Sequence, residues 1–271
     1  MSSGGGHGAA VFTMVNAFTD RAFSGNPAAV YILQAAADAG WMQAVAAEMA
    51  VPETAFVVPR DAGSYDLRWF TPTVEEELCG HATLASAHVL WERGLLPAGA
   101  EARFATRSGL VRASQAGSWI ELDFPTERVV ATEPPAGLLS GLGCSPRAVG
   151  KNRLDYLVEL AEDSLVRALD PKLHDCTELE ARGVIVTARS ASADYDFVSR
   201  FFALRENPPE DPVTGSAHCA LGAYWAERLG RTELVGYQAS RRGGVVKVRY
   251  CGPRTILLGQ AVTVMRGELV W

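Results

Sequence analysis

The chain has 271 residues, of which 48% are hydrophobic and 21% are charged, and its formal net charge is −6. This length allows two domains of ordinary size, and the acidic balance argues against nucleic acid as a partner. No apolar run approaches the roughly 20 residues that cross a membrane as a helix, so no membrane partner is expected.

The five cysteines are scattered and form no C-x-x-C pair: they are Cys79, Cys144, Cys176, Cys219 and Cys251. This spacing argues against a disulfide framework or a structural zinc site and favours the reducing cytoplasm. Residues 1–10 are rich in Ser and Gly and lack the charged and apolar regions of a signal peptide. We expect them to be a disordered lead-in.

The first elements follow from turn formers and apolar spacing. Residues 11–33 predict two strands around a turn at 20–27. Asp38 is placed to cap a helix with an apolar face, and Pro52 would stop that helix. Residues 54–58 predict a short apolar strand.

The rest of the first half predicts a strand at 67–70 and a loop at 71–80 that holds three successive acids. A helix is expected to begin at His81. Residues 103–124 are typical of a β-meander, and residues 127–144, rich in Pro and Gly, predict an interdomain linker.

The second half repeats the plan. Its expected elements are a strand at 156–160, a short helix ending at 169, strands at 184–188 and 196–202, a loop at 210–218, a helix ending at 229, and strands at 245–250, 255–258 and 262–265.

The composition of the loop at 210–218 is typical of a loop that leads into a helix whose N-terminus binds a ligand. The small residues 214–217 would let a ligand approach the unpaired N–H groups of the first helical turn, where the helix dipole favours an anion. Asp211 would stand beside that anion, which suggests proton chemistry. The alternative is an ordinary capped helix with a solvated aspartate.

An offset of 135 residues aligns similar residues of the two halves over about 45 positions. The matched pairs include Glu76 with Asp211, Gly80 with Gly215, Ala82 with Ala217, and Gly109 with Gly244. A repeat of this length suits two copies of one domain. We expect domains at 11–126 and 145–271, with the last strand free to return to the first domain.

Such a duplication would set two helix N-termini, at Gly80-His81 and Gly215-Ser216, across one cleft. Domain interfaces are a common place for small-molecule sites. Two positive helix ends in one cleft would hold a small carboxylate well.

Two further residues suit proton transfer. Glu53 follows a helix end and precedes an apolar strand, where desolvation would raise its pKa towards that of a general acid or base; the alternative is an exposed glutamate. His81, at a helix N-terminus, is expected to be neutral because the dipole disfavours its cation; it could equally be an N-cap. Cys79 and His81 lack a second ligand pair, so no metal is expected.

Six segments resemble the PhzF-like phenazine-biosynthesis family, in the right order and over nearly the whole chain: residues 16–18, 25–30, 53–56, 67–72, 78–83 and 210–218. The resemblance implies the diaminopimelate-epimerase fold. That fold is α+β, with two pseudo-symmetric domains that each form a β-barrel-like sheet around a central helix. The central helices would be 80–93 and 215–229.

The resemblance also implies a cofactor-independent isomerase, usually a homodimer, in which a glutamate moves a proton within a dihydroaromatic amino-acid substrate. By motif match the glutamate is Glu53, and His81 and Asp211 assist it. Gly80, Gly215 and Ser216 match positions that line the substrate site. Positioning and proton transfer could then suffice without a cofactor.

Two departures from the family pattern bear on the substrate: Pro52 replaces the usual Ser, and the segment 204–209 differs from the usual loop. Two other functions stay open. One is a racemase or epimerase with two thiols, for which Cys79 could serve as the first, although Cys219 lies inside the expected helix. The other is a binding or regulatory protein that keeps the cleft without catalysis.

Overall fold

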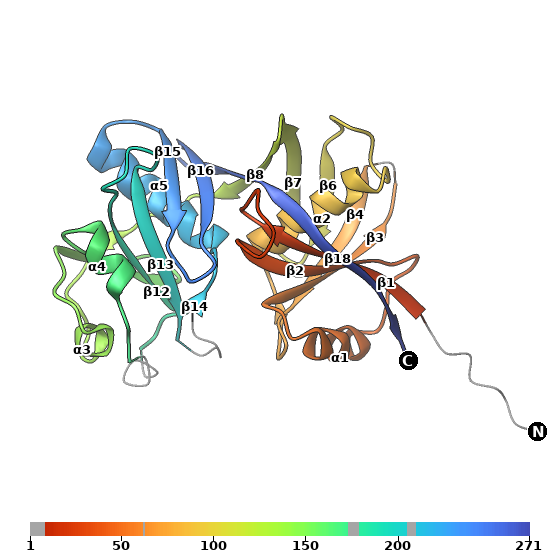
Figure 1. Ribbon diagram of the computed structural model, residues 1–271, viewed down its shortest axis with the longest axis horizontal. Helices are drawn as coiled ribbons and strands as arrows, with labels where there is room; N and C mark the ends of the chain where they lie inside the picture. Colours follow the sequence, from red (N-terminus) through yellow and green to blue (C-terminus); the bar gives the residue numbers. More distant parts are fainter. Residues whose placement is uncertain (1–8, 62, 173–178, 205–209) are drawn as a thin grey trace, which may run out of the picture.

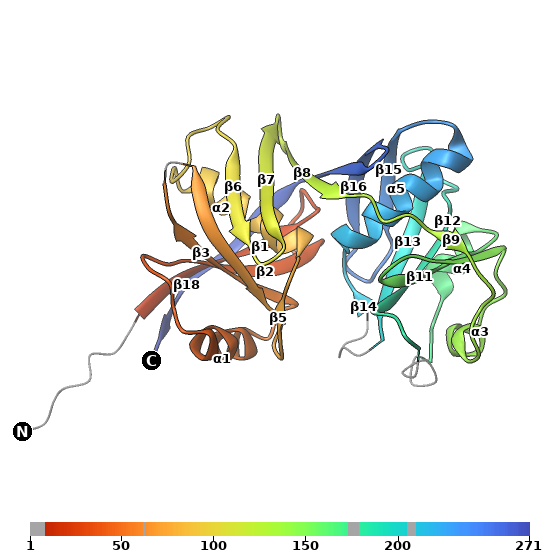
Figure 2. The ribbon, with the colours of Figure 1, turned by 180° about the vertical axis from the view of Figure 1, so that it is seen from behind.

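The computed structural model describes residues 9–61, 63–172, 179–204 and 210–271. Two lobes lie side by side, one built from the first half of the chain and the other mainly from the second (Figures 1 and 2). Strand pairing connects 18 strands through both lobes, and five helices accompany them in the described part of the chain. This mixed sheet with few helices agrees with the α+β class.

In the first lobe a sheet surrounds helix α2 (Gly80–Glu92). Its strands are β1 (Ala9–Ala17), β2 (Asn26–Ile32), β3 (Glu53–Pro59), β4 (Ser64–Phe70), β5 (Glu75–Glu76), β6 (Ala102–Thr106), β7 (Gly109–Ala116) and β8 (Trp119–Pro125). The pairs β2–β3 and β4–β6 are parallel, and the other neighbours are antiparallel. Helix α2 is buried nearly all round, as its position inside the sheet requires.

The second lobe surrounds helix α5 (Gly215–Leu229) in the same way. Its strands are β9 (Val130–Ala131), β10 (Ala148–Lys151), β11 (Asp155–Glu159), β12 (Gly183–Arg189), β13 (Phe197–Ala203), β14 (Glu210–Asp211), β15 (Glu233–Gln238), β16 (Gly244–Cys251) and β17 (Arg254–Gly259). Parallel pairs occur at β11–β12 and β13–β15, which matches the order in the first lobe. A duplicated unit would produce this shared order, and the duplication itself stays a prediction.

The lobes are joined by more than one connection. Strand β17 pairs with β8, and the final strand, β18 (Ala261–Val270), pairs with β1. One hydrophobic cluster includes side chains of both lobes, such as Leu84 in α2 and Leu221 in α5. The second lobe has a further cluster under α3 (Leu138–Leu142) and α4 (Asp163–Ala168).

Most of the expected elements are confirmed, including both strands of 11–33, the β-meander and both central helices. Helix α1 (Ala39–Met49) is capped as predicted, since the Asp38 carboxylate accepts a hydrogen bond from the Trp41 N–H at 3.1 Å. The helix ends before Pro52, with Ala50 in the left-handed conformation at a φ of 50°.

Other expectations were wrong or incomplete. The loop prediction for 71–80 missed β5, which the Arg68–Glu75 ion pair fastens to β4. Strand β15 was missed because Gly236 interrupts its pattern; a Cβ there would lie 2.5 Å from the Phe197 ring, so only glycine fits. The segment 127–144 is more than a bare connection, since it contains β9 and α3.

Two expectations fall partly outside the described residues. The lead-in prediction concerns residues 1–10, of which 1–8 are not described, while Ala9 and Ala10 belong to β1. Most of the divergent segment 204–209 is likewise not described, and so is Cys176. Among the described residues, no helix is long and apolar enough to cross a membrane.

Candidate active site

The N-termini of α2 and α5 meet between the two lobes. A Cβ placed on Gly80 would lie 3.4 Å from the Cα of Gly215, so the absence of side chains lets the two backbones approach this closely. Neither N-cap residue, Cys79 or Thr214, makes a side-chain capping hydrogen bond. The two helix ends therefore form one electropositive region suited to an anion.

Glu53 is the first residue of β3 and lies beside the start of α2. Its side chain is 18% exposed, and its Oε2 is 3.1 Å from Nε2 of His81. The alignment of the two groups falls short of a well-formed hydrogen bond, so we describe them as a close polar contact. This position matches the predicted one, between a helix end and a buried strand.

His81 is neutral in this site. Burial lowers its pKa to about 4, an effect that the negative charge of Asp211 and a hydrogen bond to the Pro27 backbone oppose. Its neutrality was predicted from the helix dipole, but burial is the larger cause. Asn26 Nδ2 at 3.2 Å and the Cys79 thiol at 3.5 Å both face Nδ1. The two amide hydrogens of Asn26 are taken by Asp211 and Val213, but the Cys79 thiol can donate to Nδ1. We therefore assign the ring proton to Nε2, on the side of Glu53.

Asn26 links the two lobes across the site. Its amide nitrogen donates to Asp211 Oδ1 at 2.7 Å and to the Val213 carbonyl at 2.9 Å. The other oxygen of Asp211 accepts from the Thr214 hydroxyl at 2.5 Å. Both carboxylate oxygens of Asp211 are thus held by neutral donors, which fixes the orientation of this acid.

Gln238 supports this arrangement from β15. Its amide nitrogen donates to the Asp211 carbonyl and its oxygen accepts from the Thr214 N–H, both at 2.8 Å. Gln238 is fully buried. No pattern in the sequence indicated this role, because Gln238 is too far along the chain from the 210–218 loop for the contact to be predicted.

Ser216, the second residue of α5, contacts an ion pair between the half-buried Arg182 and the buried Asp155. Its hydroxyl accepts a hydrogen bond from Arg182 at 2.8 Å. Arg182 also makes two hydrogen bonds with the Asp155 carboxylate, at 3.0 and 2.6 Å, and the Asp155 side chain is 1% exposed. Arg182 and Asp155 were not predicted. They place a guanidinium group, paired with a carboxylate, next to the start of α5.

The two cysteines considered for a thiol mechanism are both buried. Burial, followed by the nearby charge of Glu53, raises the pKa of Cys79 well above its usual value. Burial raises the pKa of Cys219 to about 12, and its thiol donates to the Gly215 carbonyl inside α5. Both side chains therefore remain thiols near neutral pH, and the thiol rather than the thiolate is a poor base.

Potential ligand atoms of Glu53, Cys79 and His81 lie within 4.8 Å of one another, a grouping that the sequence did not reveal. Three protein ligands would suffice for a catalytic zinc ion. Cysteine must lose its proton to bind a metal, however, and the raised pKa of Cys79 opposes that loss. The expectation of no metal thus stays a prediction.

The six predicted site residues lie on three adjoining segments: the start of β3, the start of α2 and the run from β14 into α5. Glu53 and His81 are in direct contact, and Asn26 joins His81 to Asp211. Ser216 instead faces Arg182.

Comparison with known proteins gives consistent results. The sequence profile described as phenazine biosynthesis-like protein matches residues 15–267. A protein named as an uncharacterized isomerase in Halalkalibacterium halodurans is 51% identical over 95% of this chain and 97% of its own. The phenazine biosynthesis-like domain-containing protein of Homo sapiens is 36% identical, over 94% of this chain and 97% of its own.

The solved structures extend this similarity to the fold. A PhzF-family crystal structure from Enterococcus faecalis has a TM-score of 0.91 and 36% identity, covering 97% of this chain and 99% of its own. A hydroxyproline epimerase from Agrobacterium vitis has a TM-score of 0.64 and 12% identity, covering 97% and 92%, which shows a shared fold alone. Its sequence, its fold and its named relatives place this chain in the PhzF-like, phenazine biosynthesis-like family, which includes proteins named as isomerases.

Proposed function

We propose that the protein is a cofactor-independent isomerase that moves a proton within a small carboxylate substrate, with Glu53 as the acid and base. The observation that carries this proposal is the position of Glu53. Its carboxylate, 18% exposed, lies 3.1 Å from a neutral buried histidine at the point where two helix N-termini meet. The substrate would be amino-acid-like or dihydroaromatic, as in the resembling family.

Each group has a role that its surroundings support. The first turns of α2 and α5 bind the substrate carboxylate, and Gly80 and Gly215 let these two turns approach each other closely. Glu53 takes a proton from one carbon, the electron pair of the broken C–H bond moves into the adjacent unsaturated system, and Glu53 returns the proton to another carbon. The Nε2–H of His81 faces Glu53 at 3.1 Å and helps to position its carboxylate.

Asp211 assists by receiving a hydrogen-bond donor of the substrate. Asn26 and Thr214 hold its two oxygens, so the charge is oriented before the substrate binds. Proton transfer by a positioned carboxylate contributes typically about 10²–10⁴-fold to the rate. No step in this scheme draws on a cofactor.

The test is solvent deuterium incorporation into small unsaturated and amino carboxylic acids, followed by NMR. Glu53→Gln keeps the shape but removes the base, so exchange should fall by about 10²–10⁴-fold for any accepted substrate. Glu48→Gln, an exposed glutamate in α1, is the matched control and should exchange at the wild-type rate. Equal rates in the two variants would show that the base is another group.

The two-thiol alternative has one observation in its favour, the position of Cys79 next to His81. The raised pKa values of Cys79 and Cys219 oppose it. Cys79→Ser should retain at least about half of the exchange rate, because Glu53 remains as the base. A loss as large as that of Glu53→Gln would favour the thiol mechanism, and binding without exchange across the whole acid panel would favour a regulatory protein.

A further inference from the structure

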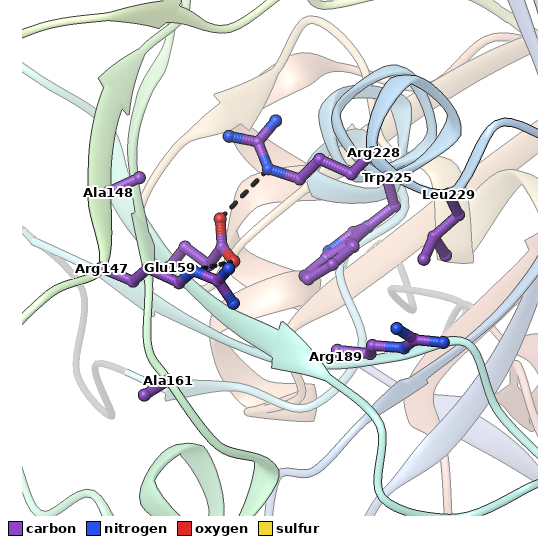
Figure 3. Close-up of a pocket in the computed structure, with 8 residues that line it drawn as sticks. All are labelled: Arg147, Ala148, Glu159, Ala161, Arg189, Trp225, Arg228 and Leu229. Atoms are coloured by element: carbon purple, nitrogen blue, oxygen red, sulfur yellow. Dashed lines mark hydrogen bonds and ion pairs between the residues drawn. The ribbon is translucent and has the colours of Figure 1, made fainter.

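A second concave site lies in the second lobe, away from the helix N-termini. A cavity of about 360 Å³ opens at the C-terminal end of α5, as Figure 3 shows. Since a helix rises about 1.5 Å per residue, the length of α5 separates this cavity from Gly215 by roughly 20 Å. Nothing in the proposed isomerase reaction uses it.

Three arginines from three separate elements line the cavity together with one carboxylate. Arg147 precedes β10, Arg189 ends β12 and Arg228 belongs to the last turn of α5. The carboxylate is that of Glu159 at the end of β11, which is 5% exposed. Trp225 contributes an apolar part of the wall.

The single carboxylate of the cavity, that of Glu159, does not pair with all three arginines. Its Oε2 accepts from the Tyr224 hydroxyl at 2.6 Å and from Arg228 at 3.1 Å. Arg147 forms an ion pair with the other oxygen at 3.9 Å, a distance too long for a hydrogen bond. The guanidinium of Arg189 has no ion pair or hydrogen bond with any residue that the structure describes.

The cavity therefore carries an excess of two positive charges, three guanidinium groups against one carboxylate. The last turn of α5 offers only a partial negative charge, about half of an elementary charge, so it does not cancel this excess. The side chains of Arg147 and Arg228 are 69% and 39% exposed, so water screens part of the repulsion between these like charges, and a bound anion would relieve the rest.

We propose that this cavity binds a small phosphate-type dianion, either inorganic phosphate or a phosphate monoester whose body lies against Trp225. A phosphate monoester carries about −1.5 to −2 charges at neutral pH, which matches the excess, whereas a single carboxylate would neutralise only half of it. Guanidinium groups also match phosphate oxygens in geometry. A volume of about 360 Å³ falls within the range of small-molecule sites.

Titration calorimetry of the full chain tests the proposal with three probes at equal ionic strength: inorganic phosphate, phenyl phosphate and acetate. We expect saturable binding of both phosphates and none of acetate at the same concentrations. Tighter binding of phenyl phosphate would identify a monoester as the ligand, and equal affinities would identify the phosphate group alone.

Arg189→Gln should weaken phosphate binding at least tenfold, and Arg147→Gln should do the same. Because Arg189 has no described partner, its loss should leave the fold intact, which circular dichroism checks. Arg112→Gln is the matched control, since Arg112 lies in the first lobe and pairs with Glu101. Acetate binding equal to that of phosphate would overturn the proposal. So would binding that Arg189→Gln leaves unchanged, which would place the anion at the α2 and α5 N-termini.

Discussion

The two lobes build the start of their central helices in the same way. In the first, Arg68 of β4 pairs with Glu75 at 2.7 Å and holds β5 beside the chain that leads into α2. In the second, Arg200 of β13 pairs with Glu210 at 2.6 Å and holds β14 before α5. A glycine then begins each helix. Each lobe thus fixes one helix N-terminus at the shared site with an equivalent ion pair.

The lobes differ at the start of the neighbouring strand. Glu53 begins β3, and Gly183 occupies the corresponding first position of β12, as the registers with β2 and β11 show. A Cβ at Gly183 would lie 2.4 Å from the Phe201 ring, so no acid fits there. Arg182 stands where the first lobe has Pro52. Both lobes can therefore contribute to anion binding, but only the first can supply this carboxylate.

The largest effect in this comparison is expected at Arg182. Arg182→Met would leave the buried carboxylate of Asp155 without its charged partner, at a cost of about 3–5 kcal/mol in the free energy of unfolding. Urea denaturation measures this cost. The double variant Arg182→Met/Asp155→Leu should recover most of the loss, because no charge then remains buried. A single variant as stable as the wild type would show that the ion pair is not required.

Asp211 and Glu76 occupy matching positions in the two lobes, at the ends of β14 and β5, but we expect their substitution to affect the solvent exchange rate differently. Asp211→Asn should lower solvent exchange by about 10–100-fold, the worth of one charged hydrogen bond to the substrate. Glu76→Gln should change it by less than about threefold, since burial raises the pKa of Glu76 and favours its neutral form. The readout is deuterium incorporation into the same substrate. Equal losses would mean that both lobes contribute an acid.

The smallest expected effect is the change in the free energy of unfolding per pH unit that comes from the buried histidines His81 and His218. Burial lowers the pKa of each from 6.5 to about 4. Below pH 6.5 the unfolded chain binds protons that the folded chain does not bind until about pH 4. Stability is therefore complete above pH 6.5 and falls as the pH drops through this window, by at most about 1.4 kcal/mol per pH unit for each histidine.

Urea denaturation between pH 6.5 and 5 measures that slope. His81→Gln and His218→Gln should each reduce the slope by up to about 1.4 kcal/mol per pH unit, the contribution of one bound proton. This holds whatever their effect on the stability at pH 7. Only His81→Gln should also impair exchange, because His218 hydrogen-bonds to the Thr214 carbonyl within α5 and does not face Glu53. An unchanged slope in both variants would mean that neither histidine is kept neutral by the fold.

Local sequence signals predicted much of the fold and part of the site. Apolar spacing located the central helices, Asp38 and Pro52 bounded α1, and the small residues around Gly80 and Gly215 marked the helix starts that meet in the structure. These features could be predicted because each depends on neighbours a few residues away. The choice of Glu53, His81 and Asp211 rested on the family motifs as well.

Contacts between distant segments were decided by the tertiary structure. Asn26 reaches Asp211 across 185 positions, Gln238 fastens the loop before α5, and Arg182 meets Ser216 only because β12 ends beside that helix. The neutrality of His81 also belongs to this level, since it follows mainly from burial by the surrounding elements. Residue patterns along the chain were enough to locate most helices and strands and the small residues at the helix starts. Only packing of the lobes decided which polar groups meet, because those pairs have no fixed separation along the chain.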